Sequence, residues 1–347
     1  MAIVRWTVVL PGALLPAPIT ADVLAGAAAP WLTRVLARAQ AAPAESFETD
    51  AVPHLSWLWR RFGGSGEPVT APYALRALDD GADLGAQCWH LDPVHFTFAR
   101  DHLLVAPLDE PPAPPEDAAL AAHLRDALDE LLADAGPTLH RHRGHWLLTL
   151  TRPWSLRATP LDGALGQPAH EHWPAGAEAA LWRRLLNETQ MRWHAVPSNE
   201  LREARGGQPV NALWLHGGGS WAALPAQPFA AVADADPVLR GWALASGLPR
   251  QSMHDEAAVA PRGDTVSIRR DLLVPAQFEA WGQWLDRLAR LDLSLRNLQQ
   301  ACFAAGYDEM VLVLCGRRQA RTVSLRRGDS WKLWRRAPLA PLLAEAE

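Results

Sequence analysis

Two short runs rich in branched apolar residues lie near the ends of the chain, IVRWTVVL at residues 3–10 and MVLVLC at residues 310–315. Runs of this length and composition are typical of buried strands. Apolar residues recur at helical spacing at residues 30–39, 118–135 and 278–305, which predicts amphipathic helices there. A strand followed by a loop and a helix at the start of the chain favours an α/β protein with a mostly parallel sheet.

The remaining patterned segments are shorter. They predict helices at residues 73–80, 177–193 and 237–246, and strands at residues 88–91, 103–105, 146–151, 210–215 and 229–233. Asp92-Pro93 favours a turn. The segment PLDEPPAPPED at residues 107–117 predicts an irregular loop, because proline removes backbone donors and breaks helices. Gly217, Gly218 and Gly219 predict a tight turn after a strand.

The basic tail at residues 317–336 alternates between apolar and charged positions. This pattern predicts a hairpin-like edge, with Val323 and Leu325 facing inward and the arginines facing outward. A contact with an acidic partner or with nucleic acid remains an alternative interpretation of the same charges.

Composition narrows the class of protein. The 347 residues include 49% hydrophobic and 20% charged residues, which is ordinary for a globular protein. A net charge of −5 gives no general attraction to nucleic acid or anionic lipid. We expect no signal peptide and no membrane span, because prolines interrupt the first apolar run and no uncharged stretch is long enough. Cys88, Cys302 and Cys315 form no disulfide or metal spacing, which favours a reducing, cytoplasmic compartment.

The stretch at residues 193–220 concentrates polar side chains that can hold an acid. It contains Asn199, Arg202, Arg205, Asn211 and His216, followed by the three glycines. Arginine holds phosphate and carboxylate groups with a two-pronged donor fork, so these residues predict an anion pocket. The alternative is a surface helix, a linker and a core strand.

Three histidine-containing groups offer other chemistry. His90, Asp92 and His95 could form a metal or acid–base group at the rim of a turn. His140, Arg141, His142, Arg143 and His145 could hold phosphate or a metal, or form a solvated loop in which adjacent side chains face opposite ways. His170, Glu171 and His172 could bind a metal weakly or lie in an exposed loop.

The same polar stretch resembles the archaeal-type cofactor-independent phosphoglycerate mutases, which carry PVN-x-x-R-x-x-x-G-x-x-P-A-N followed by R-G-x-G. The matching positions are Pro197, Asn199, Arg202, Gly206, Pro209, Asn211, Gly217 and Gly219. His216 stands where that family has arginine. The segments APWLTRVLARA, APYALRALDDGADL and VLRGWALASGL resemble other family segments in the same order.

This resemblance implies a fold and a division into domains. The implied fold is an alkaline-phosphatase-like core with a mostly parallel sheet, made of residues 1–70 and 221–347. An α+β domain at residues 71–220 would be inserted into it on the substrate side.

The resemblance also implies two divalent metals and a serine nucleophile, and here the sequence departs from the family. Leu10-Pro11-Gly12 stands where the family has an aspartate after the first strand, and Leu314-Cys315-Gly316-Arg317 replaces its late T-A-D-H motif. Thr49 and Asp50 are offset from the nucleophile position. Proline, glycine and arginine cannot replace oxygen and nitrogen ligands of a hard cation. We therefore expect the fold without the chemistry.

A second resemblance is to the bacterial RpfE-type regulatory proteins. It is carried by DPVHF at residues 92–96, by NALWLHGGG, and by Trp331-x-x-Trp334-Arg335-Arg336. The two resemblances together suggest a catalytically inactive, regulatory or ligand-sensing protein that binds a small phosphorylated or carboxylated metabolite. We expect no cofactor and no bound metal. The predicted ligand-binding residues are Asn199, Arg202, Asn211, His216, Asp92 and His95.

Two alternatives stay open. The first is an active, metal-dependent phosphoglycerate mutase or phosphatase with a rearranged site, whose candidate ligands are Asp50, His54, Asp92 and His95. The second is a structural protein that binds a protein partner through tryptophans near Trp331 and Trp334.

Overall fold

The chain forms two compact units in the computed structural model. One unit combines Met1–Pro68 with Ala223–Glu347, and the other is Val69–Ala222. The structure describes residues 3–48, 52–99, 102–142, 144–256, 259, 263–332 and 334–346. Thr49, Asp50 and Arg143, which the sequence singled out, lie outside the described residues.

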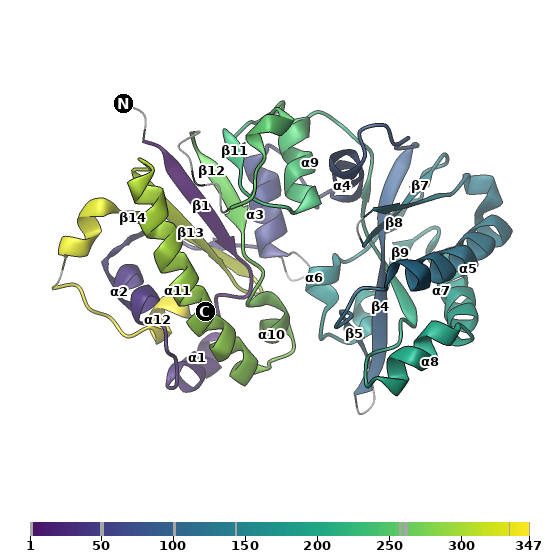
Figure 1. Cartoon of the computed structure of the whole chain (residues 1–347), viewed down its shortest axis with the longest axis horizontal. Helices are drawn as coiled ribbons and strands as arrows, with labels where there is room; N and C mark the ends of the chain where they lie inside the picture. Colours follow the sequence, from purple (N-terminus) through teal and green to yellow (C-terminus); the bar gives the residue numbers. More distant parts are fainter. Residues whose placement is uncertain are drawn as a thin grey trace. The chain divides into compact units, whose positions relative to one another are not determined.

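The first unit is built on a sheet whose centre is parallel, which confirms the predicted α/β class with a mostly parallel sheet (Figure 1). Its parallel strands, in spatial order, are β11 (Ala231–Val232), β12 (Thr265–Ile268), β1 (Arg5–Leu10) and β13 (Glu309–Cys315). The antiparallel part of the sheet consists of β14 (Gln319–Arg326), β2 (Gln40–Ala41) and β3 (Glu45–Ser46). The two apolar runs at the ends of the sequence are therefore neighbouring central strands.

One face of this sheet carries the main core. Alternate side chains of β1, including Trp6, Val8 and Leu10, pack against the apolar stripe of the longest helix. Figure 1 shows the helices gathered on this face. They are α1 (Ala17–Leu24), α2 (Pro30–Arg38), α11 (Trp281–Ala304) and α12 (Ala340–Leu343).

Asp292 of α11 fixes the start of α2. Its carboxylate accepts hydrogen bonds from the backbone N–H groups of Trp31 and Leu32, at 3.2 and 2.6 Å. These are two of the donors that a helix N-terminus leaves unsatisfied, and Pro30 has none to offer. The buried face of α2 (Trp31, Leu32 and Leu36) is thereby pinned to the core, and its opposite face is left to solvent.

An aromatic cluster joins α3 (Pro53–Arg61) and α9 (Pro237–Ala245) of this unit. Trp59, Phe62, Phe229 and Trp242 form it through ring contacts, with Trp59 and Trp242 centred 5.6 Å apart. The unit also contains α10 (Leu273–Gln277) and 3₁₀ turns at Arg250–Ser252 and Arg327–Trp331.

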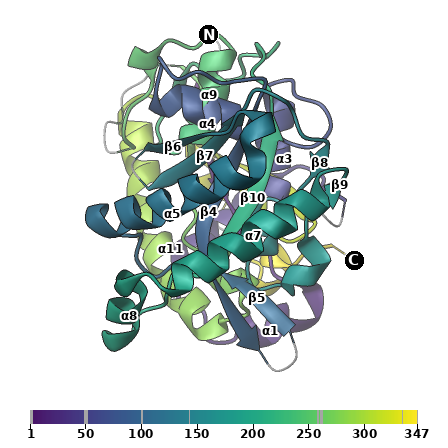
Figure 2. The same ribbon diagram turned by 90° about the vertical axis from the view of Figure 1, so that its right-hand side faces the viewer.

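The second unit is an antiparallel sheet with helices across one face. The strand order is β10 (Ala212–Gly219), β4 (Gln87–Ala99), β7 (His145–Leu150) and β6 (Thr138–His142), and β5 (His102–Ala106) also pairs with β4. Figure 2 shows α5 (Pro114–Leu132) and α7 (Ala179–His194) side by side on this sheet. The smaller elements are α4 (Ala71–Leu78), α6 (Leu161–Ala164), α8 (Pro197–Ala204), β8 (Leu156–Arg157), β9 (Ala175–Gly176) and 3₁₀ turns at Ala133–Ala135 and Ala169–His172.

The prediction of a turn at Asp92-Pro93 is wrong, because β4 continues through both residues. Pairing of β4 with β7 ends at His90, and pairing with β5 begins at His95. Pro93 thus has a strand partner only on the β10 side. A missing N–H can be tolerated at such a locally open edge, which explains how proline enters a long strand.

The predicted glycine turn is also absent, since β10 runs through Gly219 with a bulge between His216 and Gly219. Gly217 has a φ of +62°, and a Cβ atom there would lie 1.9 Å from Thr70 Oγ1. Glycine is required here by the positive φ and by the close approach of the Thr70 side chain, as is common in bulges.

Two further expectations need correction. The helix α5 already begins at Pro114, inside the segment predicted to be irregular, because proline suits the first helical turn. The strand β14 is not an edge, since β2 and β3 pair with its outer side, although Val323 and Leu325 are buried as predicted. Among the described residues, we find no helix with the length and apolar character needed to cross a bilayer.

Candidate functional site

Asn199 connects two segments of the second unit through hydrogen bonds of its side-chain amide. It is buried, and its amide donates to the carbonyl oxygens of Trp193 and Val210 at 2.9 and 3.0 Å. Its side-chain oxygen accepts from Val210 N at 2.8 Å. The amide is therefore used in joining α8 to the approach of β10, which leaves little capacity for a ligand.

Arg202 is committed to a carboxylate of the protein itself. Its Nε and Nη2 atoms lie 2.6 and 3.0 Å from the two oxygens of Glu116, and both side chains are only 13% exposed. Its Nη1 donates to the carbonyl of Glu110 at 3.1 Å. Burial raises the pKa of Glu116, but the hydrogen bond and charge of Arg202 outweigh it and leave that pKa below its usual value. The two-pronged donation predicted for Arg202 is observed, but its acceptor is the carboxylate of Glu116 in the same protein.

Asn211 and His95 extend the strand pairing of β4. Asn211 accepts from Phe96 N at 2.7 Å and donates to Phe96 O at 3.0 Å, as a neighbouring strand would. His95 Nδ1 donates to the carbonyl of Pro209 at 2.9 Å. Two of the six residues predicted to bind a ligand, Asp92 and His216, contact each other directly through their side chains.

His90, Asp92 and His216 form the most concentrated chemical group in the second unit. His216 lies directly opposite His90 in the antiparallel register of β10 and β4, and the two imidazoles stack with centroids 4.7 Å apart at an interplanar angle of 13°. Asp92 follows His90 by two positions and so shares its face of the sheet. His216 Nε2 donates to Asp92 Oδ2 at 2.8 Å. We call these three residues the histidine–aspartate cluster.

The cluster is largely shielded from solvent. His90 is 4% exposed, and the side chains of His216 and Asp92 are 12% and 23% exposed. Burial alone raises the pKa of Asp92, but the hydrogen bond from His216 and the charges of the neighbouring imidazoles outweigh it. The pKa of Asp92 therefore lies below its usual value, and the carboxylate stays ionised. An ionised carboxylate beside two imidazoles can orient an acid–base histidine or hold a metal ion.

The sequence grouped His95 locally with His90 and Asp92, and it placed His216 and Asp92 in one predicted ligand set without predicting a direct contact between them. Residues 90 and 92 share one face of a strand, because side chains alternate between the two faces. Residue 95 is an odd number of positions from both, so the same alternation places it on the opposite face. His216 joins the group only through the pairing of β10 with β4, which no spacing in the sequence reveals.

The ends of the parallel strands in the first unit hold a different network. Arg270, just after β12, donates from Nη2 to Asp236 Oδ2 at 2.9 Å and from Nη1 to His54 Nε2 at 3.3 Å. Asp234, just after β11, accepts from the backbone N–H groups of Ile268 and Asp236 at 2.7 and 2.8 Å. A guanidinium thus lies between the imidazole and the carboxylate.

This network does not fit the metal pair that the mutase resemblance implies. The strand β1 ends at Leu10 and is followed by Pro11, and β13 ends at Cys315, whose thiol pKa is raised by burial. A fixed positive charge beside the carboxylate opposes a divalent cation. The candidate ligand His54 lies in the first unit, whereas Asp92 and His95 lie in the second.

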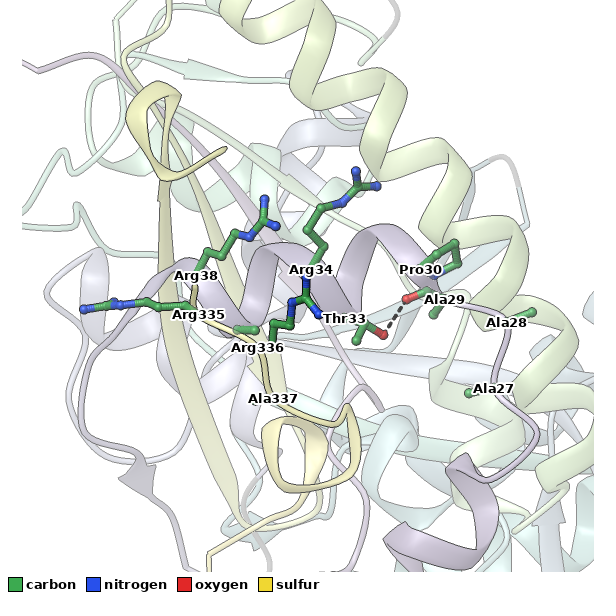
Figure 3. Close-up of a pocket in the computed structure, with 11 residues that line it drawn as sticks. Ala27, Ala28, Ala29, Pro30, Thr33, Arg34, Arg38, Arg335, Arg336 and Ala337 are labelled. Carbon is green, nitrogen blue, oxygen red and sulfur yellow. Dashed lines mark hydrogen bonds between the residues drawn. The ribbon is translucent and has the colours of Figure 1, made fainter. Parts of the chain in front are cut away.

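A pocket of about 780 Å³ lies on the outer face of α2 in the first unit (Figure 3). Residues 30, 33, 34, 37 and 38 share one face of the helix by the spacing of the α-helix, opposite its buried face. The lining is Ala27, Ala28, Ala29, Pro30, Thr33, Arg34, Ala37, Arg38, Arg335, Arg336 and Ala337. We call it the arginine pocket.

Four guanidinium groups and no carboxylate belong to the eleven residues that line the arginine pocket. Arg34 and Arg38 extend to the same side of α2, and the side chain of Arg336 runs toward Thr33, whereas Arg335 points away from the others (Figure 3). Arg34 and Arg336 are exposed. The R-x-x-x-R spacing of the helix could have indicated part of this site from the sequence. The proximity of α2 to residues 335–337 could not be inferred in this way.

The structure also describes the other groups singled out in the sequence. His140 and His142 lie on β6 and His145 begins β7, so they form part of a hairpin rather than a loop. His170, Glu171 and His172 form a 3₁₀ turn. Trp331 and Trp334 are 79% and 77% exposed.

Comparisons with known proteins bring only distant likenesses. A search with protein-family models gave no match, and a search of curated proteins gave none either. The fold is similar to that of the PH0037 protein from Pyrococcus horikoshii, at 14% identity and a TM-score of 0.48, over 94% of this chain and 88% of that one. It is also similar to a cofactor-independent phosphoglycerate mutase from Thermoplasma acidophilum, at 14% identity and a TM-score of 0.41, over 100% and 96%. At such scores, neither likeness assigns an activity.

Proposed function

We propose that this protein is a phosphoglycerate-mutase-like regulatory or ligand-sensing protein that binds a small phosphorylated or carboxylated metabolite. The arginine pocket, rather than the polar stretch at residues 193–220, is the binding site. The observation that carries the proposal is the grouping of four arginines around one pocket, with no acid among its described lining residues.

The electrostatics of α2 support an anionic occupant. Arg34 and Arg38 are four residues apart on the same face, and like charges at this spacing destabilise a helix by about 0.2–0.5 kcal/mol. Arg335 and Arg336 bring further positive charge to the same lining. A bound phosphate or carboxylate would offset this repulsion and accept several of the donors.

The volume of the arginine pocket and the chemistry of its lining limit the kinds of ligand that it can bind. A volume of about 780 Å³ falls in the range of small-molecule sites. Four of the lining residues before and on α2 are alanines, at positions 27, 28, 29 and 37, so part of the lining is small and apolar. These features favour a ligand with one or two acidic groups on a short carbon skeleton.

The absence of catalysis is part of the proposal and is supported by the network at the strand ends. Arg270 there donates to both His54 and Asp236, and its positive charge opposes a divalent ion beside them. The two alternatives, an active mutase or phosphatase and a partner-binding protein, remain predictions.

The proposal is tested by isothermal titration calorimetry with 3-phosphoglycerate and with inorganic phosphate. We expect saturable binding of at least one probe at one site per chain. Binding should weaken about 10-fold to 100-fold in the double variant Arg34→Ala/Arg336→Ala, because a hydrogen bond to a charged group contributes about 1.5–3 kcal/mol.

The matched control is Arg125→Ala, which removes an exposed arginine of α5 in the other unit and should leave the affinity unchanged. Absence of heat with both probes would contradict the proposal. Equal weakening by Arg125→Ala would do so too, since it would indicate a general charge effect.

A further inference from the structure

The histidine–aspartate cluster offers three ligand atoms for one cation. The ligand atoms of His90, Asp92 and His216 all lie within 4.8 Å of one another. Ligand bonds to Zn²⁺ are about 2.0–2.2 Å long, so ligand atoms around one ion are separated by roughly 3–4 Å. Small rotations of the side chains would bring all three into that range.

The rigidity of the ligand scaffold favours a real site. Two of the ligands stand directly opposite each other on paired strands, and the third follows on the same strand and the same face. Sites built on strands hold their geometry better than sites built on loops. The glycines of the β10 bulge and Thr70 lie against the cluster, since a Cβ atom at Gly217 would be 3.0 Å from His90 Cδ2.

A second observation points to a ligand that the protein does not supply. With Nε2 of His216 bonded to Asp92, its other ring nitrogen, Nδ1, is buried and has no hydrogen-bond partner among the described residues. A buried polar atom without a partner is costly, and such atoms mark positions for water, an ion or a ligand. The hydrogen bond between His216 Nε2 and Asp92 does not by itself give His216 Nδ1 a partner.

We propose that His90, Asp92 and His216 bind a divalent first-row transition metal ion, with Zn²⁺ as the preferred probe. Two imidazole nitrogens and one carboxylate suit zinc and iron, whereas magnesium and calcium prefer oxygen ligands alone. Three protein ligands leave a coordination position open, as in metal sites that bind water or substrate. The proposal departs from the expectation of no metal, and it does not depend on the arginine pocket.

The cluster would offer the ion one carboxylate and two imidazole nitrogens. His145 also lies near Asp92, but it is not one of the three grouped ligands.

The test uses the full-length protein after removal of metals with a chelator. Zn²⁺ is titrated by calorimetry, and Co²⁺ is used as a probe whose visible absorption reports nitrogen and oxygen coordination. We expect one equivalent of Zn²⁺ to bind, Co²⁺ to compete with it, and excess Mg²⁺ to leave it in place.

The variants Asp92→Asn and His216→Gln should each weaken Zn²⁺ binding more than about 100-fold, because even outer partners of metal ligands cost 10–100-fold when removed. Asn keeps the shape of Asp92 and an oxygen that accepts from His216, so folding should be preserved, as checked by circular dichroism. The matched control is His95→Gln on the same strand, which should bind zinc as the unaltered protein does.

Absence of Zn²⁺ binding to the unaltered protein would overturn the proposal without any need for variants. It would also be overturned if Asp92→Asn and His216→Gln bound Zn²⁺ with unchanged affinity, because the ion would then be held elsewhere, for instance at His170 and His172.

Discussion

At the residue scale, the polar side chains that look most like a binding site serve the fold instead. Arg202 has its fork filled by Glu116, and Asn199 and Asn211 act as substitutes for backbone pairing. Sequence shows which donors exist, but it does not show which acceptors meet them. A buried donor that already has an internal partner offers little to a ligand, because binding the ligand would leave the internal acceptor unsatisfied.

Replacing Arg202 with alanine should therefore lower the free energy of unfolding by about 1–3 kcal/mol, since Glu116 would lose its partner in a poorly solvated position. Urea denaturation measures this loss. Because the folded-state pKa of Glu116 is depressed, the contribution is present above its ordinary pKa of 4.5 and is lost as the pH falls through the folded-state pKa.

The difference between the two proteins should accordingly be largest near neutral pH and shrink below about pH 4.5. Anion binding measured by calorimetry should be unchanged in Arg202→Ala. A variant that is as stable as the parent but binds anions more weakly would restore the pocket first expected from the sequence.

At the element scale, the helices with a strong apolar period and the strands rich in branched residues are where the sequence places them. The helix predicted at residues 30–39 is observed at Pro30–Arg38, and the strand at residues 310–315 is observed at Glu309–Cys315. The wrong predictions concern positions where the backbone conformation depends on pairing with neighbouring strands. Pro93 is accepted in β4 only because the strand lacks a partner there on one side, and the glycines of β10 form a bulge rather than a turn.

The bulge in β10 gives a sharp test of this interpretation. Gly217→Ala should destabilise the protein by about 3 kcal/mol or more, because the new methyl group meets Thr70 and the residue has a φ of +62°. Gly206→Ala is the matched control. Its φ is +76° but nothing lies within 4 Å, so only the backbone cost of about 1–2 kcal/mol applies.

Urea denaturation of the two variants separates these contributions. Equal losses of stability would mean that the close approach of Thr70 to Gly217 does not exist. Zinc binding should also weaken in Gly217→Ala, since the displaced strand carries His216.

At the scale of the whole molecule, the second unit has the form of a continuous insertion. Its two ends are joined to each other, because Tyr73 Oη donates to the carbonyl of Ala222 at 3.2 Å and Gly219 lies against Val69. It also has its own buried residues, including Trp146, Trp182, Trp193 and Trp214. A segment with adjacent ends and its own core can fold independently.

We therefore expect the fragment Val69–Ala222 to fold when expressed alone. Circular dichroism should show mixed helix and strand, and thermal unfolding should be cooperative. The fragment should retain zinc binding and lose anion binding, since the two proposed sites belong to different units. A fragment that lacks a cooperative transition would contradict the division of the chain at these residues.

The sequence by itself determined the α/β class, the mostly parallel sheet and the main helices, because hydrophobic periodicity is a local property that each segment carries alone. Only the tertiary structure decided the sites. The opposition of His216 to His90 follows from strand pairing, and the arginine pocket follows from the contact of α2 with residues 335–337. Chemistry at a site depends on which side chains meet across distant segments, and that proximity is a property of the packed chain.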